Sequence, residues 1–362
     1  MTVLLFVGGL VLLICGAEAL VRGAVRLSAV AGISPLITGL TIVAFGTSSP
    51  ELAVSIKSAL SGEAGIAMGN IVGSNIFNVL FILGISALIT PLAVSQQLIR
   101  FDVPLMAGVS ILVLIFSLDG CISRLEGIIL FTGVILYTVF LILASYRENI
   151  EVREEYAGKY QVAAPRSFMA ISINLLLIIA GLGMLVLGSK VLVESAVSIA
   201  HTLQISEIII GLTIIAAGTS LPEVLTSIVA SLHGQRDIAV GNIIGSNLFN
   251  LLCVLGVSAA LAPAGIPVED AMIRFDLPVM IAVACACLPI FFTHGEISRW
   301  EGGVLLGYYL VYTLYLILSA TRHAALPLVS TALLYFVLPL TVITLIAVSL
   351  RFIRQKIRPG QE

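Results

Sequence analysis

The sequence predicts an all-α polytopic membrane protein with two inverted-topology repeats of five transmembrane helices and a C-terminal eleventh helix. The chain has 362 residues, of which 59% are hydrophobic and only 10% are charged; soluble domains carry about 25% charged residues. Its apolar stretches reach about 20 residues, the length that crosses a bilayer as a helix. A β-barrel would instead show alternating segments of about 10 residues. The third observation is one long signature that occurs in both halves of the chain.

Hydropathy and the positions of glycine and proline predict eleven membrane helices. The one clearly hydrophilic connection runs from Tyr146 to Ser167 and separates two sets of five helices. We therefore expect a first repeat over 1–145, a cytoplasmic linker over 146–167, a second repeat over 168–322, and an extra helix with a basic cytoplasmic tail over 323–362. The expected helices are 2–30, 34–60, 64–89, 102–118, 124–145, 168–199, 205–231, 237–261, 272–293, 298–320 and 327–350.

The charge distribution predicts the orientation of the chain. Because five is odd, the second repeat must enter the membrane from the side opposite to the first. If the N-terminus is outside, 13 of the 18 Lys and Arg residues fall on cytoplasmic ends and loops and five on the outer side, which agrees with the positive-inside rule. Met1 to Val7 lacks a basic residue, so no cleaved signal peptide is predicted. We expect an integral protein of the cell (inner) membrane with its C-terminus in the cytoplasm.

The repeated signature has two parts in each half. Gly-Leu-Thr-Ile-Val-Ala-Phe-Gly-Thr-Ser-Ser-Pro-Glu ends at Glu51, and Gly-Leu-Thr-Ile-Ile-Ala-Ala-Gly-Thr-Ser-Leu-Pro-Glu ends at Glu223. Gly-Asn-Ile-Val-Gly-Ser-Asn-Ile-Phe-Asn then ends at Asn78, and Gly-Asn-Ile-Ile-Gly-Ser-Asn-Leu-Phe-Asn at Asn250. Polar groups inside apolar spans are costly and mark functional sites, and inverted repeats of secondary transporters hold their site at the interface. The pair of clusters therefore predicts one duplicated cation site.

The first part of the signature predicts a broken helix lined with oxygen atoms. Pro50 has no N–H, and its ring clashes with the carbonyl four residues back, so the helix must kink or unwind. Carbonyl groups from Ala44 to Thr47 lose helical partners and, facing a cavity, become cation ligands. The side chains expected on one side of the helix are Thr47, Ser48, Glu51 and Ser55, repeated as Thr219, Ser220, Glu223 and Ser227.

The second part adds hydroxyl and amide groups on the next helix, where Ser74 and Asn78 are repeated as Ser246 and Asn250. Carboxylate, hydroxyl, amide and carbonyl oxygens suit Ca²⁺ and Na⁺ and argue against Zn²⁺ or Cu. Two glutamates supply a charge of −2, which one Ca²⁺ or several monovalent cations can balance. Two facing carboxylates repel one another, so we hypothesise that one holds a proton when the site is empty; pH-independent cation binding would count against this.

Simpler interpretations exist for most of these residues. Serine and threonine hydroxyls often bond to carbonyls of their own membrane helix, and Asn78 and Asn250 could hold helices together without touching an ion. Glu51 and Glu223 could be structural acids, although no basic residue lies near either in the chain at the matching depth. The remaining signature asparagines are expected to serve packing, namely Asn70, Asn75, Asn242 and Asn247.

These motifs resemble the two α-repeats of the sodium/calcium exchanger family of cation/Ca²⁺ antiporters, with similarity over about residues 1 to 322. The resemblance implies that Glu51 and Glu223 are the central Ca²⁺ ligands and that Asn78 and Asn250 complete the centre. It also implies that the first and sixth helices slide across the rest to alternate access. The further Na⁺ or Ca²⁺ ligands that it implies, by hydroxyl or carbonyl, are Thr47, Ser48, Ser74, Thr219, Ser220 and Ser246, with the carbonyls of Ala44 and Ala216.

The expected function is a secondary antiporter that exchanges Ca²⁺ for Na⁺ by alternating access at a midplane site. Position 250 is Asn where several family members carry Asp, and the loss of that charge counts against proton coupling and K⁺ co-transport. The nearest alternative is a Ca²⁺/H⁺ or K⁺-dependent Ca²⁺ antiporter of the same superfamily. A cation channel is an alternative of a different class. No enzyme is expected, because the four histidines fall near helix ends and form no catalytic dyad. The expected partners are Ca²⁺, Na⁺, with H⁺ as a further candidate, and the lipid bilayer, with no nucleic acid and no cofactor beyond the transported ions.

Overall fold

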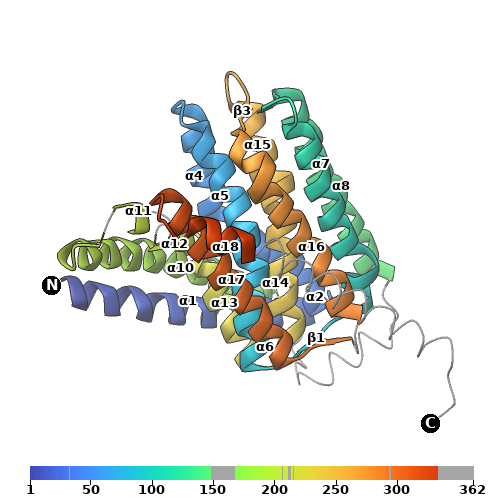
Figure 1. The fold of residues 1–362 in the computed structure, drawn as a ribbon. Helices are drawn as coiled ribbons and strands as arrows, with labels where there is room; N and C mark the ends of the chain where they lie inside the picture. The colour runs from blue at the N-terminus through green and yellow to red at the C-terminus, as the bar shows by residue number, and fades with distance from the viewer. Residues whose placement is uncertain are drawn as a thin grey trace, which may run out of the picture.

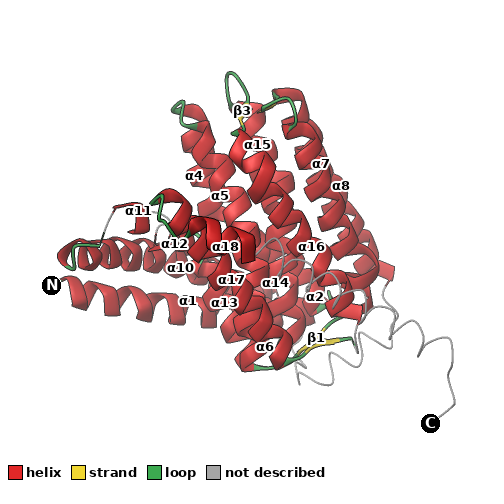
Figure 2. Cartoon of the chain, in the orientation of Figure 1, coloured by secondary structure: helices red, strands yellow, loops and turns green. Residues whose placement is uncertain are grey.

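The computed structural model is a helical bundle (Figures 1 and 2). It describes residues 1–31, 33–147, 168–205, 207–210, 213–214, 216–292 and 295–332. Most of the expected linker and the greater part of the expected eleventh helix and tail lie outside these ranges. Within them, eight helical segments are long and apolar enough to cross a membrane, or nine when one bent pair counts as a span. The predicted total of eleven, and the domain boundaries, stay predictions.

The elements follow the expected order. In the first half the helices are α1 (Thr2–Ala31), α2 (Pro35–Thr38), η1 (Gly39–Val43), α3 (Ala44–Thr47), α4 (Ser49–Leu60), α5 (Ala64–Phe77), η2 (Asn78–Leu83), α6 (Gly84–Ile89), η3 (Leu98–Asp102), α7 (Val103–Ser117) and α8 (Arg124–Arg147), where η marks π-helical segments. In the second half they are α10 (Phe168–Thr202), α11 (Glu207–Ile210), α12 (Ala216–Gly218), α13 (Leu221–Leu232), α14 (Arg236–Phe249), η5 (Asn250–Val254), α15 (Leu255–Leu261), η6 (Met272–Asp276), α16 (Leu277–Phe292), α17 (Arg299–Ala320) and α18 (Leu326–Ala332). The helix expected over 205–231 is therefore divided into short pieces.

Two small antiparallel sheets mark opposite ends of the bundle. Strand β1 (Leu92–Ala93) pairs with β4 (Glu296–Ile297), and β2 (Cys121–Ile122) pairs with β3 (Ile266–Pro267). β1 and β3 follow corresponding helices of the two halves, yet they lie at the bottom and the top of the molecule in Figure 1. Corresponding elements at opposite ends are what an inverted repeat requires.

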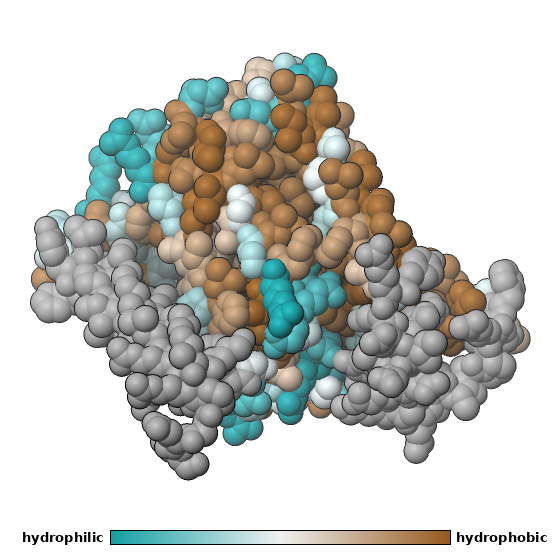
Figure 3. All heavy atoms as spheres, turned by 90° about the vertical axis from the view of Figure 1, so that its right-hand side faces the viewer, coloured by the Kyte–Doolittle hydropathy of each residue, from teal (hydrophilic) through white to brown (hydrophobic). Residues whose placement is uncertain are grey.

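The helices α1 and α10 lie side by side and run across the steeper helices of the bundle (Figure 1). Glycine allows their backbones to touch: a Cβ atom on Gly16 would lie 2.8 Å from the carbonyl oxygen of Gly181, and one on Gly9 would lie 2.8 Å from the backbone nitrogen of Leu192. Such close approach is typical of membrane helices, which gain little from burying apolar surface against one another. On the face shown in Figure 3, apolar side chains cover much of the outer surface.

The predicted helix break at Pro50 is confirmed. The segments Pro35–Thr47 and Ser49–Leu60 meet at 45°, and the linking residue Ser48 leaves helical geometry with φ −82° and ψ 7°. Ser220 has nearly the same backbone angles, φ −87° and ψ 6°. In both halves the proline lies in the first turn of the helix that follows, where its missing N–H does no harm. Each break therefore places the next glutamate at the start of a new helix.

Candidate cation-binding site

Glu51 and Glu223 lie in the first turns of α4 and α13, and both are buried, with 0% and 1% of their surface exposed. The hydroxyl of Ser48 donates to Oε1 of Glu223 at 2.8 Å. The hydroxyl of Ser220 donates to Oε1 of Glu51 at 2.9 Å. Each carboxylate is thus held by the helix break of the opposite half, and the two halves meet at these four residues.

Four buried oxygen atoms in this region have no hydrogen-bond partner among the described residues: Oε2 of Glu51, Oε2 of Glu223, Oδ1 of Asn78 and Oδ1 of Asn250. Buried polar atoms are nearly always satisfied in folded proteins. All four are acceptors, so they suit a cation or a hydrogen-bond donor and not another acceptor. In the same part of the chain, neither glutamate forms an ion pair with a Lys, Arg or His side chain.

The amide groups of Asn78 and Asn250 are oriented by the opposite half. Nδ2 of Asn78 donates to Oδ1 of Asn247 at 2.9 Å, and Nδ2 of Asn250 donates to Oδ1 of Asn75 at 3.3 Å. These bonds fix how each amide is turned, and the Oδ1 atom of each has no partner among the described residues. Asn75 and Asn247 were expected to serve packing. Their bonds join the two halves and fix the orientation of the predicted centre.

Thioethers complete the surroundings of these two asparagines. The amide of Asn247 lies 3.4 Å from the sulfur of Met106 on α7, and that of Asn75 lies 3.7 Å from the sulfur of Met280 on α16. Each amide also donates weakly to the main-chain carbonyl of the other asparagine, at 3.4 and 3.5 Å. The repetition of Asn75 at Asn247 was the sequence signal for this role, but repetition alone does not distinguish a support from a ligand.

The other predicted ligands differ in their contacts. Ser74 accepts from Ser220 at 3.1 Å, whereas the buried hydroxyl of Ser246 has no partner in the described structure. The hydroxyls of Thr47 and Thr219 donate to asparagines, at 3.1 and 3.2 Å. A hydroxyl that donates its proton keeps its lone pairs, so both the hydroxyl and the backbone carbonyl of these two threonines stay candidate ligands.

The carbonyl of Ala44 differs from expectation. It accepts a hydrogen bond from the backbone of Ser48 at 3.0 Å and lies 3.4 Å from the hydroxyl of Thr47, so the helix is intact up to the break. A carbonyl oxygen has two lone pairs, so a cation could bind here only in place of the long contact from Thr47. Its counterpart Ala216 is the first residue of α12.

The two halves are packed unequally around the site. In α14 a Cβ atom on Gly245 would lie 2.8 Å from the Cα of Leu40, whereas nothing lies within 4 Å of one on its counterpart Gly73 in α5. Gly69 likewise faces open space, whereas its counterpart Gly241 packs against the backbone of η1 and α2. The α5 side of the site is therefore the less tightly covered one.

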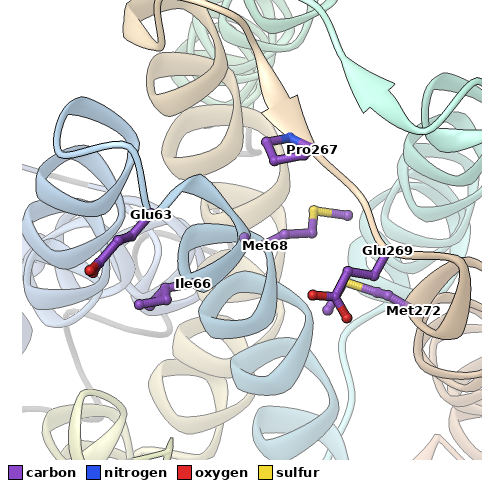
Figure 4. A pocket seen from close by; sticks show the side chains of 7 residues that line it. Glu63, Ile66, Met68, Pro267, Glu269 and Met272 are labelled. Atoms are coloured by element: carbon purple, nitrogen blue, oxygen red, sulfur yellow. The ribbon is translucent and has the colours of Figure 1, made fainter.

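A pocket of about 550 Å³ opens at the N-terminal end of α5. Figure 4 shows the carboxylates of Glu63 and Glu269 on its two sides, with Met68 between them. The full lining is Glu63, Gly65, Ile66, Met68, Pro267, Glu269 and Met272. The pocket and the loosely packed glycines Gly69 and Gly73 thus lie along the same helix, α5. Ser74 lies near the end of α5, and Asn78 is the first residue of η2, which follows it.

In the described ranges there is no group of three or more His, Cys, Asp or Glu that could hold a metal ion. The two carboxylates of the centre are joined by amides and hydroxyls only, which is a hard-oxygen environment. Such a set suits hard cations such as Ca²⁺ and Na⁺.

Comparison with known proteins identifies the family of this chain. The family model described as sodium/calcium exchanger protein matches residues 1–143 and 173–318. The chain belongs to this family. Its members are transporters of Na⁺ and Ca²⁺, so the chain is an integral membrane cation/Ca²⁺ antiporter and not an enzyme.

Individual relatives cover nearly the whole sodium/calcium exchanger chain. A putative antiporter, CaxA, from Alkalimonas amylolytica is 39% identical over 315 residues, 86% of this chain and 97% of that protein. The sodium/calcium exchanger MaX1 from Methanosarcina acetivorans is 31% identical over 334 residues, 84% of this chain and 95% of that one. The solved structure of the sodium-calcium exchanger NCX_Mj, soaked with Na⁺ and Sr²⁺, superposes with a TM-score of 0.73 at 29% identity, covering 86% and 96% of the two chains.

Proposed function

We propose that this member of the exchanger family exchanges Ca²⁺ for Na⁺ across the membrane, by alternating access to the site between Glu51 and Glu223. The observation that carries the proposal is the set of four buried oxygens without partners, two from glutamates and two from asparagines. They come equally from both halves, and no basic side chain pairs with the carboxylates among the described residues. Two buried carboxylates inside a membrane protein need a bound cation or bound protons to offset their charge.

The ligand chemistry favours Ca²⁺ at the centre. Ca²⁺ takes 6–8 oxygen ligands at about 2.3–2.6 Å, and Glu51, Glu223, Asn78 and Asn250 supply the first of these. One Ca²⁺ cancels the −2 charge. In the Na⁺-loaded state we place Na⁺ beside the same carboxylates, with flanking oxygens from Ser48, Thr47, Ser74, Ala44 and their counterparts Ser220, Thr219, Ser246 and Ala216. Because the two loads share the glutamates, one excludes the other, which is the requirement for exchange.

The unequal packing supports alternating access. The site network is nearly symmetric, with Ser48 on Glu223 matched by Ser220 on Glu51. The helices that cover the site are not symmetric. A Cβ atom on Gly245 in α14 would meet its neighbours, whereas one on Gly73 in α5 would have nothing within 4 Å. A transporter with inverted repeats reverses its accessible side when the halves exchange their roles. We propose that α5 lines the open side here and that the exchange of roles closes it.

Na⁺ is the coupling ion that we propose, with H⁺ and K⁺ as the alternatives. Asn250 brings no additional carboxylate, so the two glutamates are the acids available for protons at the centre. MaX1, which matches most of the chain, is named a sodium/calcium exchanger. A sodium/potassium/calcium exchanger of Rattus norvegicus matches 36% of this chain. We also propose an N-terminus outside the cell membrane and a cytoplasmic C-terminus.

The test is ⁴⁵Ca²⁺ uptake into proteoliposomes that contain the purified protein. An outward Na⁺ gradient should drive uptake, and replacing internal Na⁺ with choline should abolish it. Uptake that needs a pH gradient instead would replace Na⁺ with H⁺ as the coupling ion, and a requirement for internal K⁺ would identify a K⁺-dependent exchanger. Ca²⁺ current without any counter-ion would show a channel.

A further inference from the structure

We propose that Asn70 and Asn242 are positioning residues that close two hydrogen-bonded rings, each of which aims one site glutamate at the cation. Neither residue is among the predicted ligands. The inference rests on the proposed function, because it assigns these residues a role in the affinity of that same site. Each ring joins the two halves of the chain.

The first ring passes through Asn242, which is 0% exposed. Its Nδ2 donates to the hydroxyl of Ser227 at 3.0 Å and to the backbone carbonyl of Glu223 at 3.5 Å. Its Oδ1 accepts from the hydroxyl of Thr47 at 3.1 Å. The next residue, Ser48, donates to the carboxylate of Glu223 at 2.8 Å. The path from the Glu223 backbone through Asn242, Thr47 and Ser48 thus returns to the Glu223 side chain.

The second ring has the same bonds with the halves exchanged. Nδ2 of Asn70 donates to the hydroxyl of Ser55 at 3.1 Å and to the backbone carbonyl of Glu51 at 3.4 Å. Its Oδ1 accepts from Thr219 at 3.2 Å, and Ser220 donates to the carboxylate of Glu51 at 2.9 Å. Every bond of the first ring thus recurs at the counterpart residues, which general packing does not require.

The rings have a physical consequence for the carboxylates. A glutamate side chain turns about three bonds, and a ring that fixes both its backbone and Oε1 leaves one direction for Oε2. That oxygen is the buried one without a partner in each glutamate. Preorganisation of this kind raises cation affinity, and loss of outer supports typically lowers metal affinity by about 10- to 100-fold. Asn70 and Asn242 therefore act on the ion through Thr and Ser of the opposite half.

The test is a double-mutant cycle on the first ring, which contains Asn242 and Thr47. Thr47→Val keeps the shape and the backbone carbonyl of Thr47 and removes only its hydroxyl, and Asn242→Ala removes the other partner. Ser231→Ala is the matched control, because this buried hydroxyl on α13 bonds to the carbonyl of its own helix. The measurements are ⁴⁵Ca²⁺ equilibrium binding to the purified protein, KM and kcat of ⁴⁵Ca²⁺ uptake, and the thermal unfolding temperature.

We expect Asn242→Ala to weaken Ca²⁺ binding and raise KM by about 10- to 100-fold, with kcat changed less. The double variant should bind no more weakly than Asn242→Ala, because both changes open the same ring, and Ser231→Ala should bind like the unmodified protein. Multiplied effects in the double variant, or an unchanged Ca²⁺ affinity in Asn242→Ala, would overturn the inference. If Asn242→Ala does not fold, the comparison of Thr47→Val with Ser231→Ala tests the inference instead. Thr47→Val should then bind Ca²⁺ more weakly than Ser231→Ala.

The two proposals fail differently. If the unmodified protein binds Ca²⁺ but a Na⁺ gradient drives no uptake, the Na⁺/Ca²⁺ exchange is wrong and the binding measurements still test the rings. If uptake is normal and Asn242→Ala keeps its Ca²⁺ affinity, the exchange stands and the rings do not set the affinity.

Discussion

The hydroxyl of Ser48 donates a hydrogen bond to the carboxylate of Glu223 across 2.8 Å, which joins the first helix break to the glutamate of the second half. Its counterpart joins the second break to the first glutamate. Neither half can complete the site alone.

Removing one charge from the centre should abolish exchange. Glu223→Gln and Glu51→Gln keep the size of the side chain and lower the charge of the site from −2 to −1, which no longer balances Ca²⁺. ⁴⁵Ca²⁺ uptake driven by Na⁺ measures the effect. Glu126→Gln is the control, because Glu126 bonds to Ser123 at the start of α8. Full activity in either site variant would contradict the assignment.

Asn247 should matter without touching the ion. Asn247→Leu removes the acceptor that holds the amide of Asn78, so the oxygen of Asn78 is no longer aimed at the centre. We expect Ca²⁺ affinity to fall by about 10- to 100-fold. Met106→Leu also changes a neighbour of Asn247 but conserves volume, which usually costs less than about 1.5 kcal/mol. Equal affinities of the two variants in ⁴⁵Ca²⁺ binding would refute the orienting role.

Gly245 and Gly73 should respond differently to alanine. The added methyl group meets the backbone of Leu40 and Cβ of Ala44 at 2.8 Å in Gly245→Ala, whereas it meets nothing in Gly73→Ala. Gly245→Ala should therefore lower the unfolding temperature of the state described here, and Gly73→Ala should not lower it, because alanine favours the helix more than glycine does. If the state that opens to the other side of the membrane exchanges the packing around Gly73 with that around Gly245, Gly73→Ala should still slow ⁴⁵Ca²⁺ exchange. Normal exchange in Gly73→Ala would contradict that symmetry.

Ca²⁺ should stabilise the folded protein through the two glutamates. A ligand present at 100 times its Kd contributes about 2.7 kcal/mol, which a thermal unfolding curve in detergent detects. The unmodified protein should unfold at a higher temperature in Ca²⁺ than in chelator, and the double variant Glu51→Gln with Glu223→Gln should show no difference. An equal Ca²⁺ effect on both proteins would place the bound ion elsewhere.

The sequence was sufficient for the parts of this site that local chemistry determines. Pro50 predicted the break because proline lacks an N–H, and hydropathy predicted most spans because their length is set by the bilayer. The repeated signature also identified Glu51, Ser48 and Asn78 as candidates. Each of these inferences depends on neighbours in the chain.

The bonds between the halves could not be predicted in the same way. Periodicity says which face of a helix Asn75 or Asn242 occupies, but not which residue of the other half it meets. Both asparagines were therefore assigned to packing, and the structure gives them partners across the interface. The bond from the hydroxyl of the candidate ligand Thr47 to Asn242 is a contact of the same kind, which no local pattern indicates.

The central claim is that one cation lies between Glu51 and Glu223, and crystals of the protein soaked in Ca²⁺ test it most directly through anomalous difference density. We predict a peak within about 2.3–2.6 Å of oxygen atoms from both glutamates, which disappears when Na⁺ replaces Ca²⁺ in the soak. A Ca²⁺ peak that touches neither glutamate, or density there that Na⁺ does not displace, would contradict the account.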